Sequence, residues 1–174
     1  MDELKAYGGT RVMIRIAGYD PVLRDVLLEL SIRAWEPVFP LVKADVSPFV
    51  YRAFYPEGWR TRQRSDLSEV LDKEPETVDV ALDGERPVGW VSTRLHLEDN
   101  MSEVYVIVVD PEFQQRGVGR MLLEQSFQRA RDAGAAMVMV ETGDDTGHAP
   151  ARAAYESIGF ERWPVARYFK DLSV

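Results

Sequence analysis

The sequence has no cysteine among its 174 residues. This absence excludes disulfides, thiolate-ligated zinc sites and a cysteine nucleophile. Long apolar runs are missing as well, since no stretch reaches the roughly 18 residues that a membrane-spanning helix requires. The first ten residues, MDELKAYGGT, lack the basic and then apolar segments of a signal peptide. We therefore expect a cytoplasmic protein that has no membrane as a partner.

Basic side chains are outnumbered by acidic ones. The 21 Lys and Arg residues face 29 Asp and Glu residues, which gives a formal net charge of -8 at pH 7. Because phosphate binding depends on clustered cations, this balance argues against nucleic acid as a partner and leans toward a basic small molecule. The two histidines, His96 and His148, lie far apart in the sequence, and Asp144 with Asp145 alone is too little for Mg²⁺. We expect no metal site.

Nothing in the sequence divides the chain. It has no repeat, no low-complexity tract and no linker rich in Pro, Gly or Ser, and 45% of its residues are hydrophobic, enough for a packed core. We expect a single domain that spans residues 1–174.

Hydrophobic periodicity predicts a mixed α/β fold. The expected strands are 11–16, 77–82, 87–97, 104–109, 135–141 and 160–169, and the expected helices are 21–35, 59–73, 117–133 and 150–158. Asp20 and Pro21 are typical of a helix start, whereas residues 38–60 have no clear assignment. Strands 104–109 and 135–141 are almost entirely apolar, which predicts burial on both faces. Pro164 restricts the last strand to an edge or a bulge.

The most informative segment is VVDPEFQQRGVGRMLL, residues 108–123. A buried strand is followed by a short loop with two glycines and then directly by an amphipathic helix. Glycines let the backbone approach a ligand closely, and the loop N–H groups lie at the positive end of the helix dipole. This pattern predicts an anion site that Arg116 and Arg120 flank.

Two common nucleotide motifs do not fit this loop. The third glycine of a dinucleotide fingerprint is absent, since residue 122 is Leu, and no P-loop sequence occurs anywhere. A bare G-x-G is also compatible with a tight turn that binds no ligand. A phosphate-binding interaction domain therefore stays open as one reading of the segment.

Two motifs together resemble the GNAT family of N-acetyltransferases. QQRGVG, residues 114–119, matches the Q/R-x-x-G-x-G/A motif of that family, and ARAAYESIGF, residues 151–160, resembles its late helix, which ends in Tyr-x-x-x-Gly-Phe. The resemblance covers roughly residues 11–170. It implies a GNAT-like acyl-CoA N-acyltransferase fold with a mixed, mostly antiparallel central sheet flanked by helices.

The resemblance also implies acetyl-CoA as co-substrate and no metal. Backbone amides of the loop would bind its pyrophosphate, and the end of the preceding strand would pair with the pantetheine arm and polarise the thioester carbonyl. His148 stands where the family often has an Asn that holds this arm. The residues implicated in cofactor binding are Ile107, Val108, Val109, Gln115, Arg116, Gly117, Val118, Gly119, Arg120 and His148.

Transfer to an amine requires a proton acceptor for the ammonium and a donor for the departing thiolate. By the same resemblance, Tyr155 is the donor candidate and Glu103 the base candidate, with Glu141 in reserve. Each residue also has a purely structural alternative: Tyr155 could be a core aromatic, and Glu103 a solvated charge at the end of a strand. Three roles stay open for His148: a cofactor contact, an alternative base or a helix cap. The helix cap is the plainest of the three.

The acceptor would lie near the aromatic-rich stretch 35–59, with Trp90 as a further candidate, unless these aromatics simply fill a core. We expect an acetyltransferase that moves the acetyl group directly from acetyl-CoA to a primary amine in a ternary complex. The amine belongs to a small molecule or a protein, and a homodimer is left open. The alternative is a non-catalytic acyl-CoA-binding or sensor module.

Overall fold

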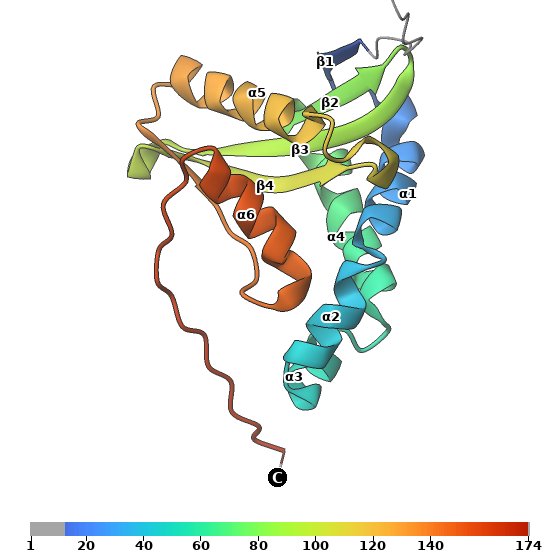
Figure 1. Cartoon of the computed structure of the whole chain (residues 1–174), viewed down its shortest axis with the longest axis vertical. Helices are drawn as coiled ribbons and strands as arrows, with labels where there is room; N and C mark the ends of the chain where they lie inside the picture. The colour runs from blue at the N-terminus through green and yellow to red at the C-terminus, as the bar shows by residue number, and fades with distance from the viewer. Residues whose placement is uncertain (1–12, 174) are drawn as a thin grey trace, which may run out of the picture.

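A computed structural model describes residues 13–173, and its centre is a five-stranded sheet (Figure 1). The strands are β1 (Ile14–Gly18), β2 (Val78–Asp83), β3 (Arg86–His96), β4 (Met101–Val109) and β5 (Met137–Val140), and they lie side by side in chain order. The first four strands pair antiparallel, whereas β4 and β5 pair in parallel. The expected mixed, mostly antiparallel sheet is confirmed.

Helices cover both faces of this sheet (Figure 1). One face packs against α1 (Arg24–Trp35) and α4 (Trp59–Lys73), and the other against α5 (Val118–Asp132), with α6 (Ala149–Ser157) beside it. The expected helices at 59–73, 117–133 and 150–158 are confirmed to within a residue or two. No helix among residues 13–173 combines the length and the apolar character that crossing a membrane demands.

The first helix starts as expected, and most of its predicted apolar stripe of Val22, Val26, Leu27, Leu30 and Ala34 faces the core. Asp20 Oδ1 accepts a hydrogen bond from the Val22 N–H at 2.9 Å, yet Pro21–Leu23 form a 3₁₀ turn before α1 begins. Leu27, Leu30 and Ala34 are buried as expected, and Leu28 is buried beside them. Val22 and Val26, within or next to the 3₁₀ turn, are exposed, because a 3₁₀ turn rotates each residue further around the axis than an α-helix does.

The segment without a clear assignment forms two short helices, α2 (Val38–Asp45) and α3 (Pro48–Phe54). Part of its aromatic content is core, since Phe39 stacks on Trp59 with ring centroids 4.3 Å apart and Tyr55 meets Phe39 edge-on. Trp90 is fully buried, and its Nε1 donates to Ser31 Oγ at 2.9 Å. Trp90 is therefore a core residue, as the alternative reading of these aromatics predicts, and it does not line an acceptor pocket.

The late strands differ most from the sequence-based expectation. β5 covers only 137–140 and is an edge strand with Met137 exposed, and in β4 the Tyr105 side chain is 42% exposed, so neither strand is buried on both faces. Residues 160–169 form no strand, because the chain leaves the sheet after α6 and Pro164 has no N–H for a ladder. Residues 11 and 12 of the first expected strand lie outside the described residues.

Close contact between β3 and the end of β4 depends on one glycine. A Cβ on Gly89 would lie 2.7 Å from the carbonyl oxygen of Val108 and 3.2 Å from a Leu122 methyl carbon. Gly18 in β1 is a matched control, because a Cβ there meets nothing within 4 Å.

We predict that Gly89→Ala lowers the free energy of unfolding by about 1–3 kcal/mol, since backbone cannot move aside as a flexible side chain can. Gly18→Ala is expected to change it by no more than about 0.5 kcal/mol. Urea unfolding of both variants measures the difference. Equal stabilities would show that β3 and β4 separate freely at this point.

Candidate functional site

The site begins where β4 and β5 separate. Their ladder ends at the pair Val104 and Val140, although β4 continues to Val109. On the other edge of β4, Ser92 faces Val106 while Thr93 faces Val104, so Tyr105 is the extra residue of a β-bulge. The bulge bends β4 away from β5 just beyond their last pair. A gap in the sheet with an open backbone edge follows.

Alternation along β4 decides which backbone groups face this gap. The Asp110 N–H donates to the Val88 carbonyl of β3, and the register pairs Val108 with Trp90. Backbone groups of successive residues point to opposite edges, so those of Val108 face β3 and those of Ile107 and Val109 face the gap. The Val109 carbonyl receives only the Gln114 side-chain amide, at 3.2 Å. Of the three predicted backbone contacts, two lie on the open edge.

Asp110 fixes the start of the loop that follows β4. Its buried carboxylate accepts from the Glu112 N–H at 3.0 Å and pairs with Arg33 at 2.8 Å and Arg86 at 3.3 Å. Burial alone would raise the pKa of Asp110, but the hydrogen bond from Glu112 and the guanidinium of Arg33 outweigh it and lower that pKa. Sequence reasoning missed this role, although an Asp-Pro after a buried strand is a common signal of a side-chain cap.

The loop wraps around the first turn of α5. Gln115 has a φ of 58° and Gly117, the N-cap, a φ of 85°, both in the left-handed region. Within the described part of the chain, the N–H groups of residues 115–120 donate to no protein acceptor. This row of free donors at the positive end of a fifteen-residue helix has the geometry of an anion site.

The two loop arginines lie at the rim. Arg116 stacks over the Phe113 ring, with its guanidinium carbon 5.1 Å from the ring centroid, and Arg120 pairs with Glu124 at 2.9 Å. Both arginine side chains are exposed, so either can turn toward a ligand at little cost.

Tyr155 projects from α6 into the apolar cluster on the α5 face of the sheet, where Ile107 and Val109 also pack. Its ring meets Phe160 edge-on with centroids 5.7 Å apart. Burial raises the pKa of Tyr155 to about 12, so the phenol keeps its proton at neutral pH. The structure thus brings Tyr155 to the same face as the open end of β4.

Glu103 lies on the opposite face. It is the register partner of Arg94, which forms a bidentate pair with Glu74 at the end of α4, and cross-strand partners share a face. Its carboxylate is 2.9 Å from His96 Nε2. Glu103 pairs with Met139 in the ladder and so precedes the gap, and nothing in the structure brings it to Tyr155.

His148 is held in a built pair with Asp145. Its Nδ1 lies 2.8 Å from Asp145 Oδ2, and it occupies the N-cap position of α6 without capping through its side chain. Two glycines make room for this pair. A Cβ on Gly143 would fall 2.1 Å from Asp145 Oδ2, and one on Gly147 would fall 3.0 Å from Oδ1. His148 thus holds the helix-cap position that the plain reading predicts, but its side chain pairs with Asp145, whose carboxylate caps the preceding 3₁₀ turn.

The remaining predicted residue, Glu141, is exposed and pairs with Arg167 at 2.7 Å.

Sequence reasoning did not identify Tyr105, whose ring is half-exposed. The guanidinium carbon of Arg94 lies over this ring, 3.2 Å from its centroid. Nearby, burial raises the pKa of Tyr55, on the α2–α3 side of the molecule. Among residues 13–173 no group of three or more His, Asp or Glu side chains gathers in a way that would hold a metal ion.

The fold matches solved structures of N-acetyltransferases. The PaiA N-acetyltransferase of Thermoplasma acidophilum, solved with coenzyme A, superposes with a TM-score of 0.61 over 86% of this chain and 90% of that one, at 12% identity. A family model described as the acetyltransferase (GNAT) family matches residues 46–160, more than half of the chain. The chain belongs to the GNAT acetyltransferase family.

Two curated relatives of this chain have names that describe acetyl transfer to different acceptors. A mycothiol acetyltransferase of Thermomonospora curvata is 40% identical over 80 residues, which cover 46% of this chain but only 26% of that protein. The ribosomal protein bS18-alanine N-acetyltransferase of Salmonella typhimurium is 33% identical over 85 residues, covering 49% of this chain and 55% of that one. The chain therefore matches about a quarter to a half of the length of these relatives.

We predict that Asp110→Asn destabilises the fold by about 1–3 kcal/mol at pH 7, because Arg33 and Arg86 lose a buried anionic partner. The folded-state pKa of Asp110 is lowered, so its contribution is present above the unfolded value of about 4 and is lost as the pH falls below it. Denaturation measured between pH 3 and 7, roughly the range in which carboxylates titrate, should show the two proteins converging at the acidic end. A pH-independent difference would contradict an ionic origin.

Proposed function

We propose that the protein transfers an acetyl group from acetyl-CoA to a primary amine, directly and within a ternary complex. The observation that carries this proposal is the open edge of β4, which is followed directly by the row of free loop N–H groups at the same end of the gap. Family membership supports it, as do relatives whose names describe acetyl transfer to small molecules and to a protein.

The residues present fit acetyl-CoA. The N–H groups of 115–120 match a pyrophosphate, because each is free and aligned with a helix dipole. Backbone groups of Ile107 and Val109 match an amide-containing arm that adds to β4 like a strand. A Cβ on Gly119 would lie 3.6 Å from Val109 Cγ2, in ordinary contact, so a larger side chain there would extend between the loop and the strand. When bound, acetyl-CoA supplies an activated acyl group as a thioester.

Tyr155 is the proposed acid. A phenol with a pKa of about 12 stays protonated at neutral pH, so its O–H is available to hydrogen-bond to the departing thiolate as charge develops on the sulfur. Tyr155, Ile107 and Val109 pack against the same apolar cluster, which supports this assignment. We propose that the Tyr155 hydroxyl reaches the open strand edge at the gap between β4 and β5.

Glu103 remains the proposed base, with His148 and Glu141 as alternatives. The hydrogen bond from His96 to Glu103 supports a role in proton transfer through water, and the Asp145–His148 pair supports the first alternative. Glu141 has the weakest support, because it is exposed and bound to Arg167.

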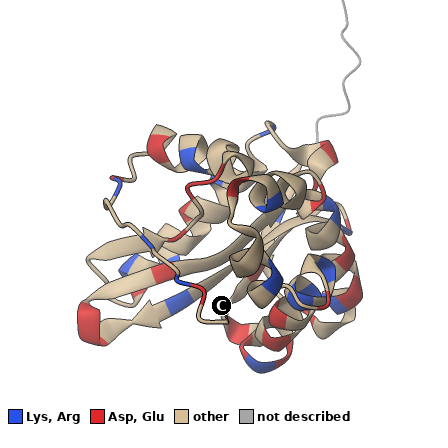
Figure 2. Ribbon diagram, turned by 90° about the horizontal axis from the view of Figure 1, so that it is seen from below, with Lys and Arg blue, Asp and Glu red and all other residues tan. Residues whose placement is uncertain are grey.

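The acceptor is proposed to be a small basic amine or a protein amine that approaches from the α2–α3 side. Tyr51, Tyr55 and Tyr105 offer aromatic faces there, and acidic side chains are interleaved with basic ones over the helices (Figure 2). A cation would gain from both kinds of contact. We propose the cytoplasm as its location, since the chain lacks cysteine and acetyl-CoA is an intracellular metabolite. A non-catalytic acyl-CoA-binding module is the second candidate, since it needs only the loop and the strand edge.

We predict that calorimetric titration shows micromolar binding of both acetyl-CoA and CoA and much weaker binding of ATP, since ATP lacks an arm that can pair with β4. Gly119→Val is expected to weaken binding of acetyl-CoA by at least about tenfold, because its side chain points at Val109 across the proposed path. Gly18→Val, in the open at β1, is the matched control. ATP binding as tight as CoA would favour the phosphate-binding interaction domain instead.

We predict that Tyr155→Phe lowers kcat by about 10²–10⁴-fold and leaves the Kd of CoA nearly unchanged, since only the donated proton is lost. Release of CoA thiol is measured with a chromogenic disulfide, and the cysteine-free protein gives no background. The acceptors tried are a polyamine, an aminoglycoside and a peptide with a free N-terminal alanine.

Unchanged turnover in Tyr155→Phe would reduce Tyr155 to a core aromatic. In the same assay, Glu103→Gln and His148→Gln identify the base, because only loss of the base removes the acidic limb of the kcat/KM profile. Acetyl-CoA binding without turnover on any acceptor would favour the non-catalytic module.

A further inference from the structure

Two groups of the proposed site share one face of α6. His148, at the N-cap, and Tyr155 are nearly two helical turns apart, so their side chains point the same way, about 10 Å from each other along the axis. Burial follows this period: residues 148, 151, 152, 155 and 158 are partly buried, and the residues between them are exposed. Tyr155 packs against the same apolar cluster as Ile107 and Val109. The shared face is therefore the one turned toward the open edge of β4.

Asp145 decides which nitrogen of His148 is free. Its Oδ2 and Oδ1 lie 2.8 Å and 3.0 Å from His148 Nδ1, and Oδ1 also accepts from the His148 N–H at 3.2 Å. A carboxylate only accepts, so Nδ1 carries the ring proton and Nε2 keeps its lone pair. No protein group among residues 13–173 bonds to Nε2. An imidazole that a carboxylate orients in this way is a proton acceptor.

The loop that holds this pair is locked onto α6. Arg152, one turn beyond His148 on the same face, donates from Nη1 to the carbonyls of Gly143 at 2.5 Å and Asp145 at 2.8 Å. The helix thus binds its own preceding loop. The pair keeps its geometry before any ligand arrives, which an acid–base group requires.

The other side of this loop meets the helices from which the acceptor is proposed to approach. The Thr146 N–H and hydroxyl donate to Asp45 of α2, and in Figure 1 the loop before α6 turns toward α2. Burial raises the pKa of Tyr55, after α3, and the Tyr51 phenol and the Asp145 carboxylate add to this rise. Asp145 is therefore within electrostatic reach of Tyr55. The pair borders the acceptor side of the gap.

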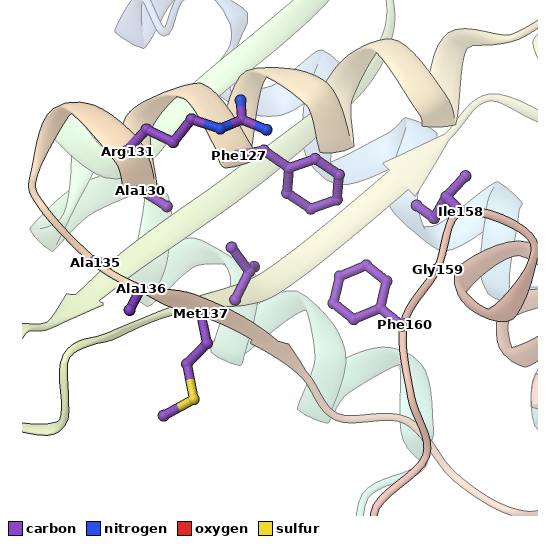
Figure 3. A pocket seen from close by; sticks show the side chains of 10 residues that line it. Phe127, Ala130, Arg131, Ala135, Ala136, Met137, Ile158, Gly159 and Phe160 are labelled. Atoms are coloured by element: carbon purple, nitrogen blue, oxygen red, sulfur yellow. The ribbon is translucent and has the colours of Figure 1, made fainter.

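The far end of α6 is anchored in an apolar pocket. Figure 3 shows Ile158 and Phe160, which follow α6, pointing toward Phe127 of α5. The Phe160 ring lies 5.8 Å from that of Phe127 and 5.7 Å from that of Tyr155. With both ends fixed, α6 holds His148 and Tyr155 at a constant separation.

The proposed reaction has a proton to place between these two groups. An ammonium nitrogen loses two protons on becoming an amide. The first leaves before attack, since only the neutral amine has a lone pair, and Glu103 is its proposed acceptor. Attack forms the C–N bond and moves the carbonyl π pair onto oxygen, so the nitrogen is positive again. Collapse restores the carbonyl and breaks the C–S bond, which leaves a second proton on nitrogen and an electron pair on sulfur.

Tyr155 alone does not supply the proton that the sulfur needs. Burial raises the pKa of Tyr155 to about 12, above that of an ordinary thiol, so its O–H protonates sulfur only where another acid replaces its proton at once. An imidazolium is a stronger acid than a thiol and meets this need. The separation of about 10 Å corresponds to a chain of about two or three waters at roughly 2.8 Å per hydrogen bond.

We propose that Asp145, His148 and Tyr155 form a proton relay along α6. His148 Nε2 takes the second proton from the amine nitrogen and passes it through water to the Tyr155 hydroxyl, as that hydroxyl protonates the departing sulfur. Asp145 is a positioning residue that keeps Nε2 free. The relay rests on the proposed function and gives His148 a role separate from that of Glu103. Of the two protons, one ends on the sulfur of CoA and the other leaves through Glu103.

The first test determines the tautomer of His148 without any substrate. The full chain has only two histidines, so nitrogen NMR with His148→Gln as a reference identifies the His148 ring. The neutral ring is expected to carry its proton on Nδ1. Asp145→Asn is expected to give a mixture of tautomers, because an amide both accepts and donates. A proton on Nε2, or a tautomer that Asp145→Asn leaves unchanged, would remove Asp145 from the relay.

The second test measures kcat by release of CoA thiol. We expect His148→Gln to lower kcat by about 10²-fold and Asp145→Asn by about 10- to 100-fold, with the Kd of acetyl-CoA unchanged. In the His148→Gln background, neither Asp145→Asn nor Tyr155→Phe should add its full loss, because groups that act as a unit are not additive. Asp144→Asn is the matched control, since its exposed carboxylate pairs with Arg162, and it should turn over like the wild type.

The outcomes separate the relay from the proposed function. Losses that multiply in the double variants, or single variants as active as the wild type, overturn the relay and leave acetyl transfer intact. A loss confined to the Kd of acetyl-CoA would make His148 a cofactor contact instead. A wild-type protein that turns over no acceptor overturns the proposed function and the relay together.

Discussion

The structure depends on the point where β4 loses its neighbour. Backbone donors and acceptors in a sheet must be paired or exposed to something that pairs with them. Up to Val104 the β4 ladder with β5 meets this demand, and beyond it the bulge at Tyr105 turns the strand away. The open backbone of Ile107 and Val109, the buried Asp110 that anchors the loop and the N-terminus of α5 all follow within fifteen residues. The bulge at Tyr105 thus places an open strand edge and a loop with free N–H groups at the same end of the gap.

Much of this could be predicted from the sequence, because its signals are local. The loop was identified by Gly117 and Gly119 between an apolar run and an amphipathic helix, and the helix 59–73 by its periodicity. The bulge could not be predicted, since Tyr105 reads as one more apolar strand residue and only the register with Ser92 and Thr93 reveals it. For the same reason the sequence predicts burial of Val104–Val109 on both faces, whereas Tyr105 is exposed.

A second cause explains why the sequence did not reveal the roles of some residues. Asp110, Asp145 and Trp90 derive their roles from partners distant in the sequence or from the shape of a loop. Arg33 reaches Asp110 from α1, and Ser31 of the same helix meets Trp90. The space for Asp145 and His148 exists only because residues 143 and 147 are glycine, which is evident once the loop is folded and not before. The sequence pattern could assign these residues to strands, helices and loops, but it could not identify the side chains with which they interact.

What keeps the gap open is the last constraint. β5 has only four ladder residues, too few to hold its position through backbone pairing alone. The loop after it is fastened to α2 instead: the Thr146 N–H and hydroxyl both donate to Asp45 at 2.7 Å, and these bonds lower the pKa of Asp45. Gly147 lies so close to α2 that a Cβ would come within 2.7 Å of the Val38 carbonyl. The loop that bounds the gap is therefore held in place by α2 as well as by the sheet.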